Sequence, residues 1–439
     1  METKEQQWVC KFGGSSLANA KRIANVKQIV LADPRRRFIV VSAPGKEGPN
    51  DTKITDLLLD CHQKAVQGVS FEQQFDQIRQ RIRGISQALG SDEQQIEHVL
   101  NDIQQQLPKH KTSDYALSRG EYLNALMIAP YLEATFVDAT DIIFLSEEGT
   151  IEQKSYDKVR QKLAHIEGRV VIPGFYGTGV DSSIKTFSRG GSDISGALVA
   201  KAVGAALYEN WTDVSGIYNA DPNIVASAQP IELITYKELR QLSLLGASVF
   251  HEDAIEPVNQ AAIPIKVKNT NAVSEEGTLI TVNRSSCVPT VAGVTGKREC
   301  RLFTFSSFML DHQPNQKEAL RSALKLFKLK PLVSVDALDA MAFYCPIELS
   351  DTEAQQIVQT IQEQTHIEEA HVSQEFSLVG VVGTHISSQQ NLLTTLDGAF
   401  KKEDIAAQLL SPAFNSALVF SVPPSVYERA LRTAIKALF

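Results

Sequence analysis

Short apolar runs alternate with amphipathic stretches along the first two thirds of the chain. Trp8 to Phe12 is a β-prone run that ends at Gly13-Gly14, and the stretch after it repeats apolar residues at helical spacing up to Val30. This pattern predicts a strand, a tight turn and a capped helix. Phe38 to Val41 is a second apolar run, and Thr55 opens a second helical stretch. Two strand-then-helix units in succession predict a parallel sheet.

Further along, the pattern predicts a helical excursion and the rest of the sheet. Residues 71–107 are rich in glutamine and carry apolar residues at helical spacing, which indicates helices outside the sheet. We expect one α/β domain over residues 1–285, with a mostly parallel sheet between helices. The other predicted elements are a helix at 113–129, extended runs at 134–137 and 142–145, a strand at 170–172, a helix at 194–205 and strands at 207–211 and 264–267.

The alternation of strands and helices changes after Val288. Two successive units of about 70 residues, without a glycine-rich turn between strand and helix, favour paired α+β modules with ferredoxin-like layers. We expect these modules at residues 286–375 and 376–439, in a binding or pairing role. The first has predicted strands at 301–305, 332–335 and 340–344 and helices at 316–329 and 353–364; the second has strands at 377–382, 406–410 and 417–422 and helices at 391–401 and 426–438.

Composition narrows the class of protein. The chain of 439 residues is 43% hydrophobic and 21% charged, ordinary values for a globular protein. Asp plus Glu outnumber Lys plus Arg by 51 to 43, which argues against a nucleic-acid partner. Five cysteines lie far apart without a CxxC pair, so a reducing compartment fits best. The polar N-terminus and the lack of an apolar run of about 18 residues predict a soluble, cytoplasmic protein with no membrane partner.

Residues 11–16, Lys-Phe-Gly-Gly-Ser-Ser, are the first candidate for chemistry. A glycine pair between a strand and a helix lets backbone N–H groups approach an anion, and Lys11 adds a positive charge beside them. The spacing is neither that of a Walker loop nor that of a dinucleotide turn, so a purely structural turn explains it equally well. Its place on the first strand of a parallel sheet favours a ligand, since ligands gather at the carboxyl ends of such strands.

Residues 188–193, Ser-Arg-Gly-Gly-Ser-Asp, are the second candidate. Arg189 offers a planar fork for a carboxylate or phosphate, whereas Asp193 falls in a first helical turn, where the helix dipole alone favours an acid. Asp213 at a strand end suits a ribose or a metal, and Glu121 suits an ammonium group, although an exposed turn and a solvated helix face explain these two acids equally well. The nine histidines form no HxxxH or HxH pair and no GxSxG motif occurs, so neither a metal site nor a serine hydrolase is predicted.

Taken together, four motifs in order resemble the aspartokinase branch of the amino-acid kinase family, and the resemblance covers essentially the whole chain. It implies the amino-acid kinase fold for residues 1–285 and a pair of regulatory ACT modules after it. The implied reaction transfers the γ-phosphoryl of Mg-ATP to the side-chain carboxylate of L-aspartate and gives 4-phospho-L-aspartate for lysine or diaminopimelate, threonine and methionine biosynthesis. The motifs are KFGGSS at 11–16, SRGE at 118–121, SRGGSD at 188–193 and WTDVSGIYNADP at 211–222.

This chemistry depends on charge neutralisation more than on proton transfer. An aspartate carboxylate is already ionised at neutral pH, so no general base is required, and the obstacle is repulsion between two anions. The resemblance implies that Lys11 lies at the transferring phosphoryl group, that Asp193 organises Lys11, and that Mg²⁺ is held mainly through the nucleotide. It assigns aspartate to Thr55, Glu121, Arg189 and Ser192, and ATP to Lys11, Gly13, Gly14, Ser15, Thr212, Asp213, Tyr218 and Asp221.

The sequence departs from the family pattern on the nucleotide side. Ser15 stands where threonine is usual and keeps the hydroxyl, but Asn223 replaces an expected arginine and Ser248 an expected lysine. Two cations are therefore missing, which leaves nucleotide affinity and donor preference open. These losses suggest a non-catalytic amino-acid sensor as the alternative function; the retention of the other site residues as a set argues against it. Glutamate, acetylglutamate and uridylate kinases share the glycine turn but lack the SRGE and SRGGSD combination.

The C-terminal modules resemble those of lysine-sensitive aspartokinases. Met309 and the triplet Ser334-Val335-Asp336 carry this resemblance, with Asp336 as the partner of an effector ammonium. It implies that lysine, or threonine, binds between modules of two subunits and inhibits, in a homodimer or higher oligomer. Pro314-Asn315-Gln316 replace an expected Gly-Phe-Leu, so a purely dimerising module is the open alternative. Because the chain ends at Phe439 inside the second module, no dehydrogenase domain is expected.

Overall fold

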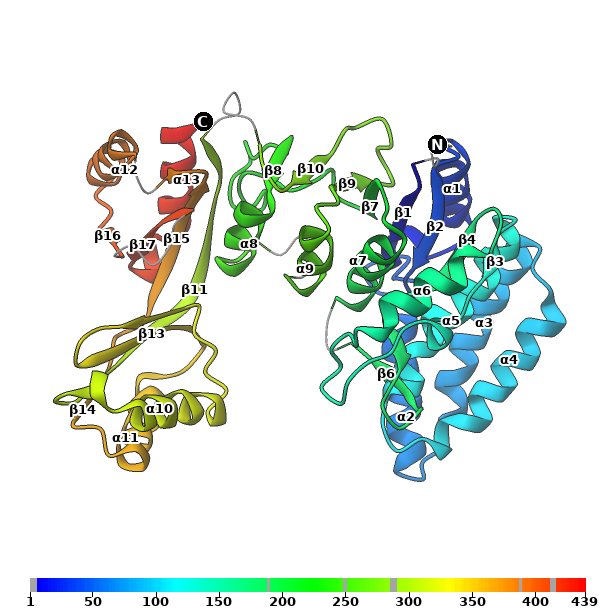
Figure 1. Ribbon diagram of the computed structural model, residues 1–439, viewed down its shortest axis with the longest axis horizontal. Coiled ribbons are helices and arrows are strands. Elements are labelled where there is room, and N and C mark those ends of the chain that lie inside the picture. Colours follow the sequence, from blue (N-terminus) through cyan, green and yellow to red (C-terminus); the bar gives the residue numbers. More distant parts are fainter. Residues whose placement is uncertain are drawn as a thin grey trace. The chain divides into compact units, whose positions relative to one another are not determined.

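The computed structural model describes residues 6–187, 190–247, 250, 252–284, 290–386, 389–410 and 416–439. These residues divide into two compact units (Figure 1). The first takes its described residues from Met1–Ile217, Glu232–Tyr236 and Val249–Arg284, and the second from Tyr218–Ile231, Lys237–Ser248 and Ser285–Phe439. Two segments that precede residue 285 thus pack with the C-terminal part of the chain, a grouping that the sequence pattern did not predict.

Within the described part of the first unit, eight strands form one sheet in the order β3-β4-β2-β1-β7-β9-β10-β8. Neighbours from β3 to β9 are parallel, whereas β10 runs antiparallel to β9 and parallel to β8. The predicted mostly parallel sheet is confirmed; β8 and β10 extend it and were not predicted. The strands are β1 (Trp8–Phe12), β2 (Arg36–Val41), β3 (Thr135–Phe136), β4 (Val170–Pro173), β7 (Leu207–Thr212), β8 (Leu233–Thr235), β9 (Ile265–Asn269) and β10 (Thr278–Thr281).

Helices surround this sheet, and two of them form the predicted excursion at residues 71–107. Helices α3 (Glu72–Leu89) and α4 (Glu93–Gln106) pack against each other and against α5 (Asp114–Tyr131), as Figure 1 shows. Their periodic apolar side chains, among them Ile82 and Leu100, are buried in the same core as Phe12 of β1. The excursion is therefore fixed to the sheet by a shared core. The unit also contains α1 (Ala20–Leu31), α2 (Ile54–Val66), α6 (Lys154–Ala164), α7 (Gly191–Val203), α9 (Glu252–Gln260) and a hairpin of β5 (Tyr176–Thr178) and β6 (Ile184–Thr186).

The second unit is built on one antiparallel sheet. In its described residues seven strands pair, with the main order β12-β13-β11-β15-β17-β16 and with β14 beside β11. Helices α10 (Pro314–Leu326) and α11 (Asp351–Thr365) share one apolar core with β11 and β13, and α12 (Gln390–Lys402) and α13 (Tyr427–Leu438) share another with β15 and β17. The strands are β11 (Val291–Ser306), β12 (Val333–Asp336), β13 (Ala340–Pro346), β14 (Glu369–Val372), β15 (Phe376–Gly383), β16 (Gln408–Leu409) and β17 (Ala417–Val422); α8 (Tyr236–Leu244) also contributes here.

Strand β11 is much longer than the predicted strand at 301–305. Its first part pairs with β15 and its second part with β13 and β14, so it belongs to both predicted modules. The register shifts between Lys297 and Cys300, and Glu299 there has a φ of 57°. This bulge places polar residues in the middle of the strand and breaks the alternation of apolar positions, which explains why the sequence pattern shows only its second part.

Candidate functional site

Strands β1 and β7 bring Lys11 and Asn210 to the same side of the sheet. Lys11 pairs in register with Asn210, and its ammonium nitrogen Nζ lies 3.5 Å from Oδ1 of Asn210 and 2.6 Å from Oδ1 of Asp193. Nδ2 of Asn210 donates to the same Asp193 oxygen at 3.0 Å. Lys11 is 8% exposed, so a buried cation is held by one carboxylate and one amide at the centre of the sheet.

Asn210 is a residue that the sequence reasoning missed. It lies in the buried run Leu-Tyr-Glu-Asn-Trp of β7, where side chains alternate between the two faces of the sheet. Glu209, its neighbour, faces the other side and forms a buried ion pair with Arg36 at 2.7 Å. The sequence did contain a signal for Asn210: a polar amide in a buried strand indicates a buried hydrogen-bonding partner, here Lys11 of the neighbouring parallel strand.

The helix α7 starts at Gly191, three residues earlier than predicted, so Ser192 and Asp193 lie in its first turn. Gly174, after β4, lies so close that an added Cβ would be 2.9 Å from Oγ of Ser192. The neighbouring N–H of Phe175 donates to Oγ of Ser195 at 3.0 Å, which fixes the loop after β4 on the start of α7. The structure thus brings Ser192, Asp193 and Lys11 into one region, whereas Arg189 lies outside the described residues.

Two glycine-containing loops meet above β1. The N–H of Gly45, in the loop after β2, donates to the carbonyl of Gly14 at 2.8 Å, and the N–H of Gly13 donates to the carbonyl of Trp211 at 3.0 Å. A Cβ on Gly45 would lie 2.5 Å from the carbonyl carbon of Gly14, and one on Gly14 would lie 2.8 Å from the carbonyl oxygen of Ala43. Only glycine permits this close approach of two backbones, so the turn is more specific than a simple strand-to-helix connection.

Glu121 on α5 is a buried carboxylate with an unusual environment. It is 5% exposed, and its Oε2 has no hydrogen-bond partner among the described residues. Burial raises the pKa of Glu121 from its ordinary value of 4.5 to about 8, against the opposing effect of backbone hydrogen bonds from Ala43 and from Glu121 itself. A buried carboxyl with a free acceptor atom is suited to receive a cationic donor from a ligand.

Gly120, the residue before Glu121, lies where the segments that were predicted to bind aspartate meet. A Cβ on Gly120 would lie 2.7 Å from Cβ of Ala43 and 3.7 Å from Oγ1 of Thr55, so α5, the loop after β2 and the start of α2 are in close contact. Thr55 therefore lies near Glu121, as the resemblance implies. Arg119 of the same motif packs against aromatic rings. Its guanidinium carbon lies 4.9, 4.6 and 5.4 Å from the ring centroids of Tyr115, Tyr122 and Tyr176.

The residues that were predicted to bind the nucleotide are divided between the two units. Thr212 and Asp213 follow β7 in the first unit, where Oγ1 of Thr212 donates to Oδ1 of Asp213 at 3.2 Å. The carbonyl of Thr212 accepts from the N–H of Thr270 at 2.8 Å, and the Thr270 hydroxyl lies 2.9 Å from that of Ser16. Thr270, which the sequence reasoning did not select, thus ties the end of β7 to the glycine turn. It belongs to no motif, so only the structure reveals it.

Tyr218 and Asp221 belong to the second unit. Oδ1 of Asp221 accepts from the backbone N–H and from Nδ2 of Asn223, at 2.9 and 3.0 Å. The residue that replaces the expected arginine therefore closes a local turn on Asp221. Ser248 lies outside the described residues.

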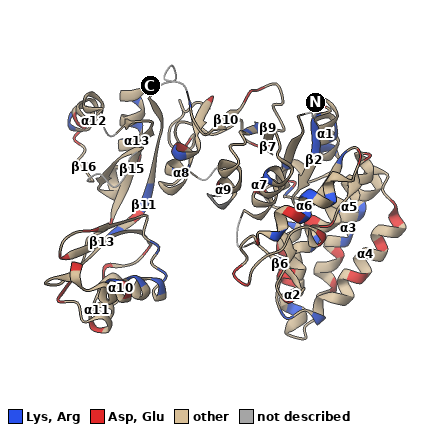
Figure 2. Ribbon diagram, in the orientation of Figure 1, with Lys and Arg blue, Asp and Glu red and all other residues tan. Residues whose placement is uncertain are grey.

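The predicted effector residues lie in the second unit. Met309 is 44% exposed, and Ser334, Val335 and Asp336 lie on β12, at an edge of the sheet. Asp336 is paired with cations of α10, which carries Lys and Arg residues shown blue in Figure 2; Oδ2 of Asp336 lies 3.0 Å from Arg321 and 3.9 Å from Lys317. Asp336 thus already has two cationic partners, which an effector ammonium would have to displace or share.

Nowhere in the described part of the chain do three His, Cys, Asp or Glu side chains gather as they would around a metal ion. Among the described helices, none combines the length and the apolar character needed to cross a bilayer.

Comparison with known proteins identifies the family. The sequence model of the Amino acid kinase family matches residues 6–269. Aspartokinase 3 of Bacillus subtilis is 30% identical over 98% of this chain and 97% of its own length. Among solved structures, the aspartate kinase of Clostridium acetobutylicum is 35% identical with a TM-score of 0.87 over 98% of this chain and all of that one. Aspartokinase III of Escherichia coli, solved with aspartate and ADP, shares the fold with a TM-score of 0.80 at 24% identity, over 99% of this chain and all of that one. The resemblance and the fold class predicted from the motifs are confirmed, and the chain belongs to the amino acid kinase family, in its aspartokinase branch.

Proposed function

We propose that this protein is an aspartate kinase, which transfers the γ-phosphoryl group of Mg-ATP to the side-chain carboxylate of L-aspartate. The observation that carries the proposal is the buried ammonium of Lys11, held at 2.6 Å by Asp193 at the carboxyl ends of β1 and β7. The family membership and the full-length relatives support the same reaction. ATP is the phosphoryl donor in this proposal, and Mg²⁺ enters with its phosphates.

In the proposed mechanism the residues supply charge and position. The aspartate carboxylate is ionised at neutral pH, so the chain has to bring two anions together and needs no general base. Lys11 neutralises negative charge on the transferring phosphoryl group, while Gly14 and Ser15 offer backbone donors beside it. The N–H of Gly13 is bound to the carbonyl of Trp211, so Gly13 contributes through the turn it forms. Asp193 and Asn210 keep the Lys11 ammonium in one place, so little reorganisation is needed during transfer.

The aspartate is oriented by groups at both of its ends. Glu121 accepts from its α-ammonium, which explains a buried carboxylate oxygen that has no partner among the described residues. Thr55 and Ser192 contribute hydroxyls, and Arg189 binds the α-carboxylate as a bidentate partner, as the family resemblance implies. On the nucleotide side we assign Thr212, Asp213, Tyr218 and Asp221.

The regulatory proposal is that lysine binds the C-terminal modules and inhibits, with Asp336 as the partner of an effector ammonium. We also propose the domain ranges 1–285, 286–375 and 376–439, an oligomer formed through the modules, a place in lysine, threonine and methionine biosynthesis, and a cytoplasmic location. The last is supported by Cys10, Cys61, Cys300 and Cys345, which are buried and unpaired; Cys287 lies outside the described residues.

The test of the catalytic proposal is ADP release from Mg-ATP with L-aspartate, L-glutamate, N-acetylglutamate or no acceptor, with hydroxylamine to trap an acyl phosphate. We expect aspartate-dependent turnover and hydroxamate formation. Binding of aspartate without turnover on any acceptor would contradict the proposal and would favour the amino-acid sensor.

A further inference from the structure

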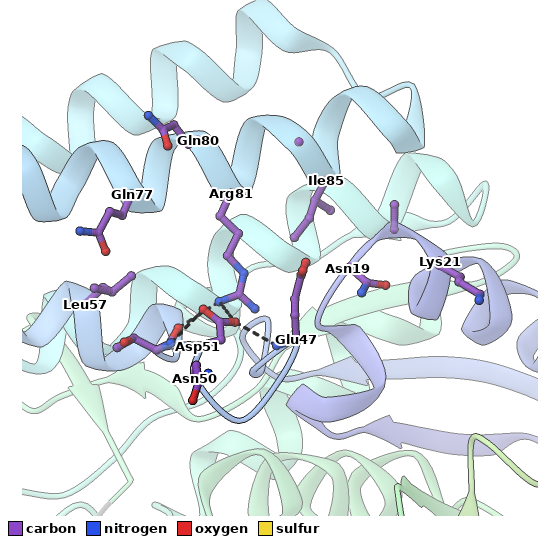
Figure 3. Close-up of a pocket in the computed structure, with 13 residues that line it drawn as sticks. Asn19, Lys21, Glu47, Asn50, Asp51, Leu57, Gln77, Gln80, Arg81 and Ile85 are labelled. Carbon is purple, nitrogen blue, oxygen red and sulfur yellow. Dashed lines mark hydrogen bonds and ion pairs between the residues drawn. The ribbon is translucent and has the colours of Figure 1, made fainter.

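Arg81 of α3 joins three backbone segments that the proposed site depends on. Its Nη1 donates to the carbonyl of Thr52 at 3.0 Å and lies 2.8 Å from Oδ2 of Asp51. Its Nη2 donates to the carbonyl of Ala18 at 3.4 Å and also to that of Gly45. Figure 3 shows this guanidinium pointing from α3 to the loop that carries Asp51.

Two of these positions, Ala18 and Gly45, border the glycine turn after β1, and the third, Thr52, leads into α2. Ala18 directly follows the 3₁₀ helix Gly14–Leu17, which starts within that turn. Gly45 contacts Gly14 through its backbone N–H. Thr52 lies just before α2, which starts at Ile54 and carries Thr55 in its first turn. One side chain from the helical excursion therefore connects the phosphate side and the aspartate side of the proposed site.

Asp51 forms hydrogen bonds within the same loop. Its Oδ2 accepts from the N–H of Glu47 at 2.9 Å and its Oδ1 from the N–H of Thr52 at 2.8 Å. The guanidinium of Arg81 thus neutralises the carboxylate around which the loop is wrapped, and both side chains are mostly shielded, at 13% and 32% exposure. A planar donor group with several N–H bonds suits this arrangement, whereas a lysine ammonium could not span the same carbonyl groups.

Besides Arg81, Arg22 reaches this loop through a long hydrogen bond of 3.5 Å to the carbonyl of Lys46. A cavity of about 840 Å³ lies between α3, the start of α1 and the loop at 47–52, and it is lined mostly by polar side chains such as Asn19, Asn50 and Gln77 (Figure 3). A loop with few buried apolar contacts opens easily, so polar anchors decide its order. Arg81 contacts this loop at three points, namely the carbonyls of Gly45 and Thr52 and the carboxylate of Asp51.

We propose that Arg81 is a positioning residue, which keeps the loop at 45–52 seated on the glycine turn so that both halves of the phosphoryl-transfer site stay aligned. This inference rests on the proposed aspartate kinase function. Because small displacements of reacting groups cost large factors in rate, we expect Arg81→Ala to lower kcat/KM for aspartate by about tenfold or more. Arg81→Lys keeps a positive charge beside Asp51, so its kcat/KM should lie between those of the unmodified protein and Arg81→Ala.

Arg83→Ala is the matched control. Arg83 lies on the same helix, its side chain is 49% exposed, and its ion pair is with Glu97 of α4 rather than with the loop. The variants are compared by steady-state kinetics with aspartate and ATP varied separately. Hydrogen exchange is followed at the amides of Gly45 and Thr52, and guanidinium chloride at millimolar concentration is added to Arg81→Ala, since the adjacent cavity admits it.

The proposal expects faster exchange at Gly45 and Thr52 and a loss of kcat/KM in Arg81→Ala but not in Arg83→Ala, and partial recovery of Arg81→Ala with guanidinium. Equal kinetics in Arg81→Ala and Arg83→Ala would overturn it, even if the loop exchanges faster. If exchange also rises throughout the sheet, Arg81→Ala has lost its fold. The proposal is then decided by comparing kcat/KM and the exchange at Gly45 and Thr52 between Arg81→Lys and the control Arg83→Ala. If the unmodified protein does not turn over aspartate, the proposed function fails, and the exchange at Gly45 and Thr52 still decides whether Arg81 orders the loop.

Discussion

The ammonium nitrogen of Lys11 lies 2.6 Å from Oδ1 of Asp193, and the same oxygen accepts a hydrogen bond from Asn210. A cation fixed in this way stabilises a charge that develops in the transition state. We predict that Lys11→Met lowers kcat of ADP release by about 10²–10³-fold, or roughly 3–4 kcal/mol, because one preorganised donor is lost. Lys162→Met, at a side chain that is 53% exposed, is the control. A Lys11→Met protein with more than a tenth of the original kcat would contradict this role.

Glu121 should make the stability of the ligand-free protein depend on pH. In the unfolded chain its pKa has the ordinary value of 4.5, and burial raises it to about 8 in the folded protein. Between these values the folded protein keeps a proton that the unfolded chain has released, so the free energy of unfolding falls as the pH rises from 4.5 to 8. Denaturant unfolding across this range should show that Glu121→Gln reduces this fall. Parallel curves for both proteins would refute the prediction.

The same carboxyl should couple aspartate binding to proton release. If Glu121 accepts from the α-ammonium, the ionised form binds, so below its pKa of about 8 each aspartate bound displaces a proton. We predict that aspartate affinity rises from pH 6 to pH 8, and that calorimetry in buffers of different ionisation enthalpy detects the released proton. Glu121→Gln should bind more weakly and without this pH dependence. An equally pH-dependent affinity in that variant would assign the proton to another group.

Gly45 should tolerate no side chain, whereas Gly48 in the same loop should. A Cβ on Gly45 would lie 2.5 Å from the carbonyl carbon of Gly14, while nothing lies within 4 Å of one on Gly48. Gly45→Ala must push the two backbones apart, which we expect to cost about 1–3 kcal/mol of stability, as overpacking does, and to raise KM for ATP. Thermal unfolding and kinetics check this against Gly48→Ala. Similar behaviour of the two variants would argue against the close loop contact.

Asn223 offers a test of the missing cations on the nucleotide side. Its side chain donates to Asp221 at 3.0 Å and supplies no charge. We predict that Asn223→Arg lowers KM for ATP severalfold, since an arginine pairs with phosphate through charge-assisted hydrogen bonds. Gln374→Arg adds the same charge at an exposed position of another loop and should change little. An unchanged KM for ATP in Asn223→Arg would show that nucleotide affinity does not depend on this position.

Asp336 should decide the response to lysine. Because Arg321 and Lys317 already neutralise it, an effector ammonium has to compete with them. We predict that lysine binds and inhibits the intact protein, that Asp336→Asn abolishes this, and that Arg321→Ala strengthens it. Isothermal titration and inhibition curves measure both effects. A flat isotherm with the unmodified protein, well above millimolar lysine, would leave the C-terminal modules with a dimerising role only.

Much of the architecture can be predicted from the chain because local patterns specify it. Apolar runs such as Phe38 to Val41 form the parallel strands, and the helical spacing of Ile78, Ile82 and Ile85 gives α3 its buried face. Strands β8 and β10 were not predicted, and the bulge near Lys297 hides the first part of β11. Local signals thus fail where an element is held by its neighbours rather than by its own periodicity.

By itself, the sequence determined the fold class, the family and a set of candidate residues, because motifs and periodicity are properties of neighbouring residues. The family resemblance implied that Asp193 organises Lys11, and the tertiary structure gave the direct ion pair between them. Only the tertiary structure added Asn210 to this pair and brought together Gly45 with Gly14, and Arg81 with the loop between β2 and α2. It also decided that the carboxyl of Glu121 is buried and its pKa raised. The physical reason is that burial, close backbone approach and pairing across strands depend on residues far apart in the chain, which leave no local pattern.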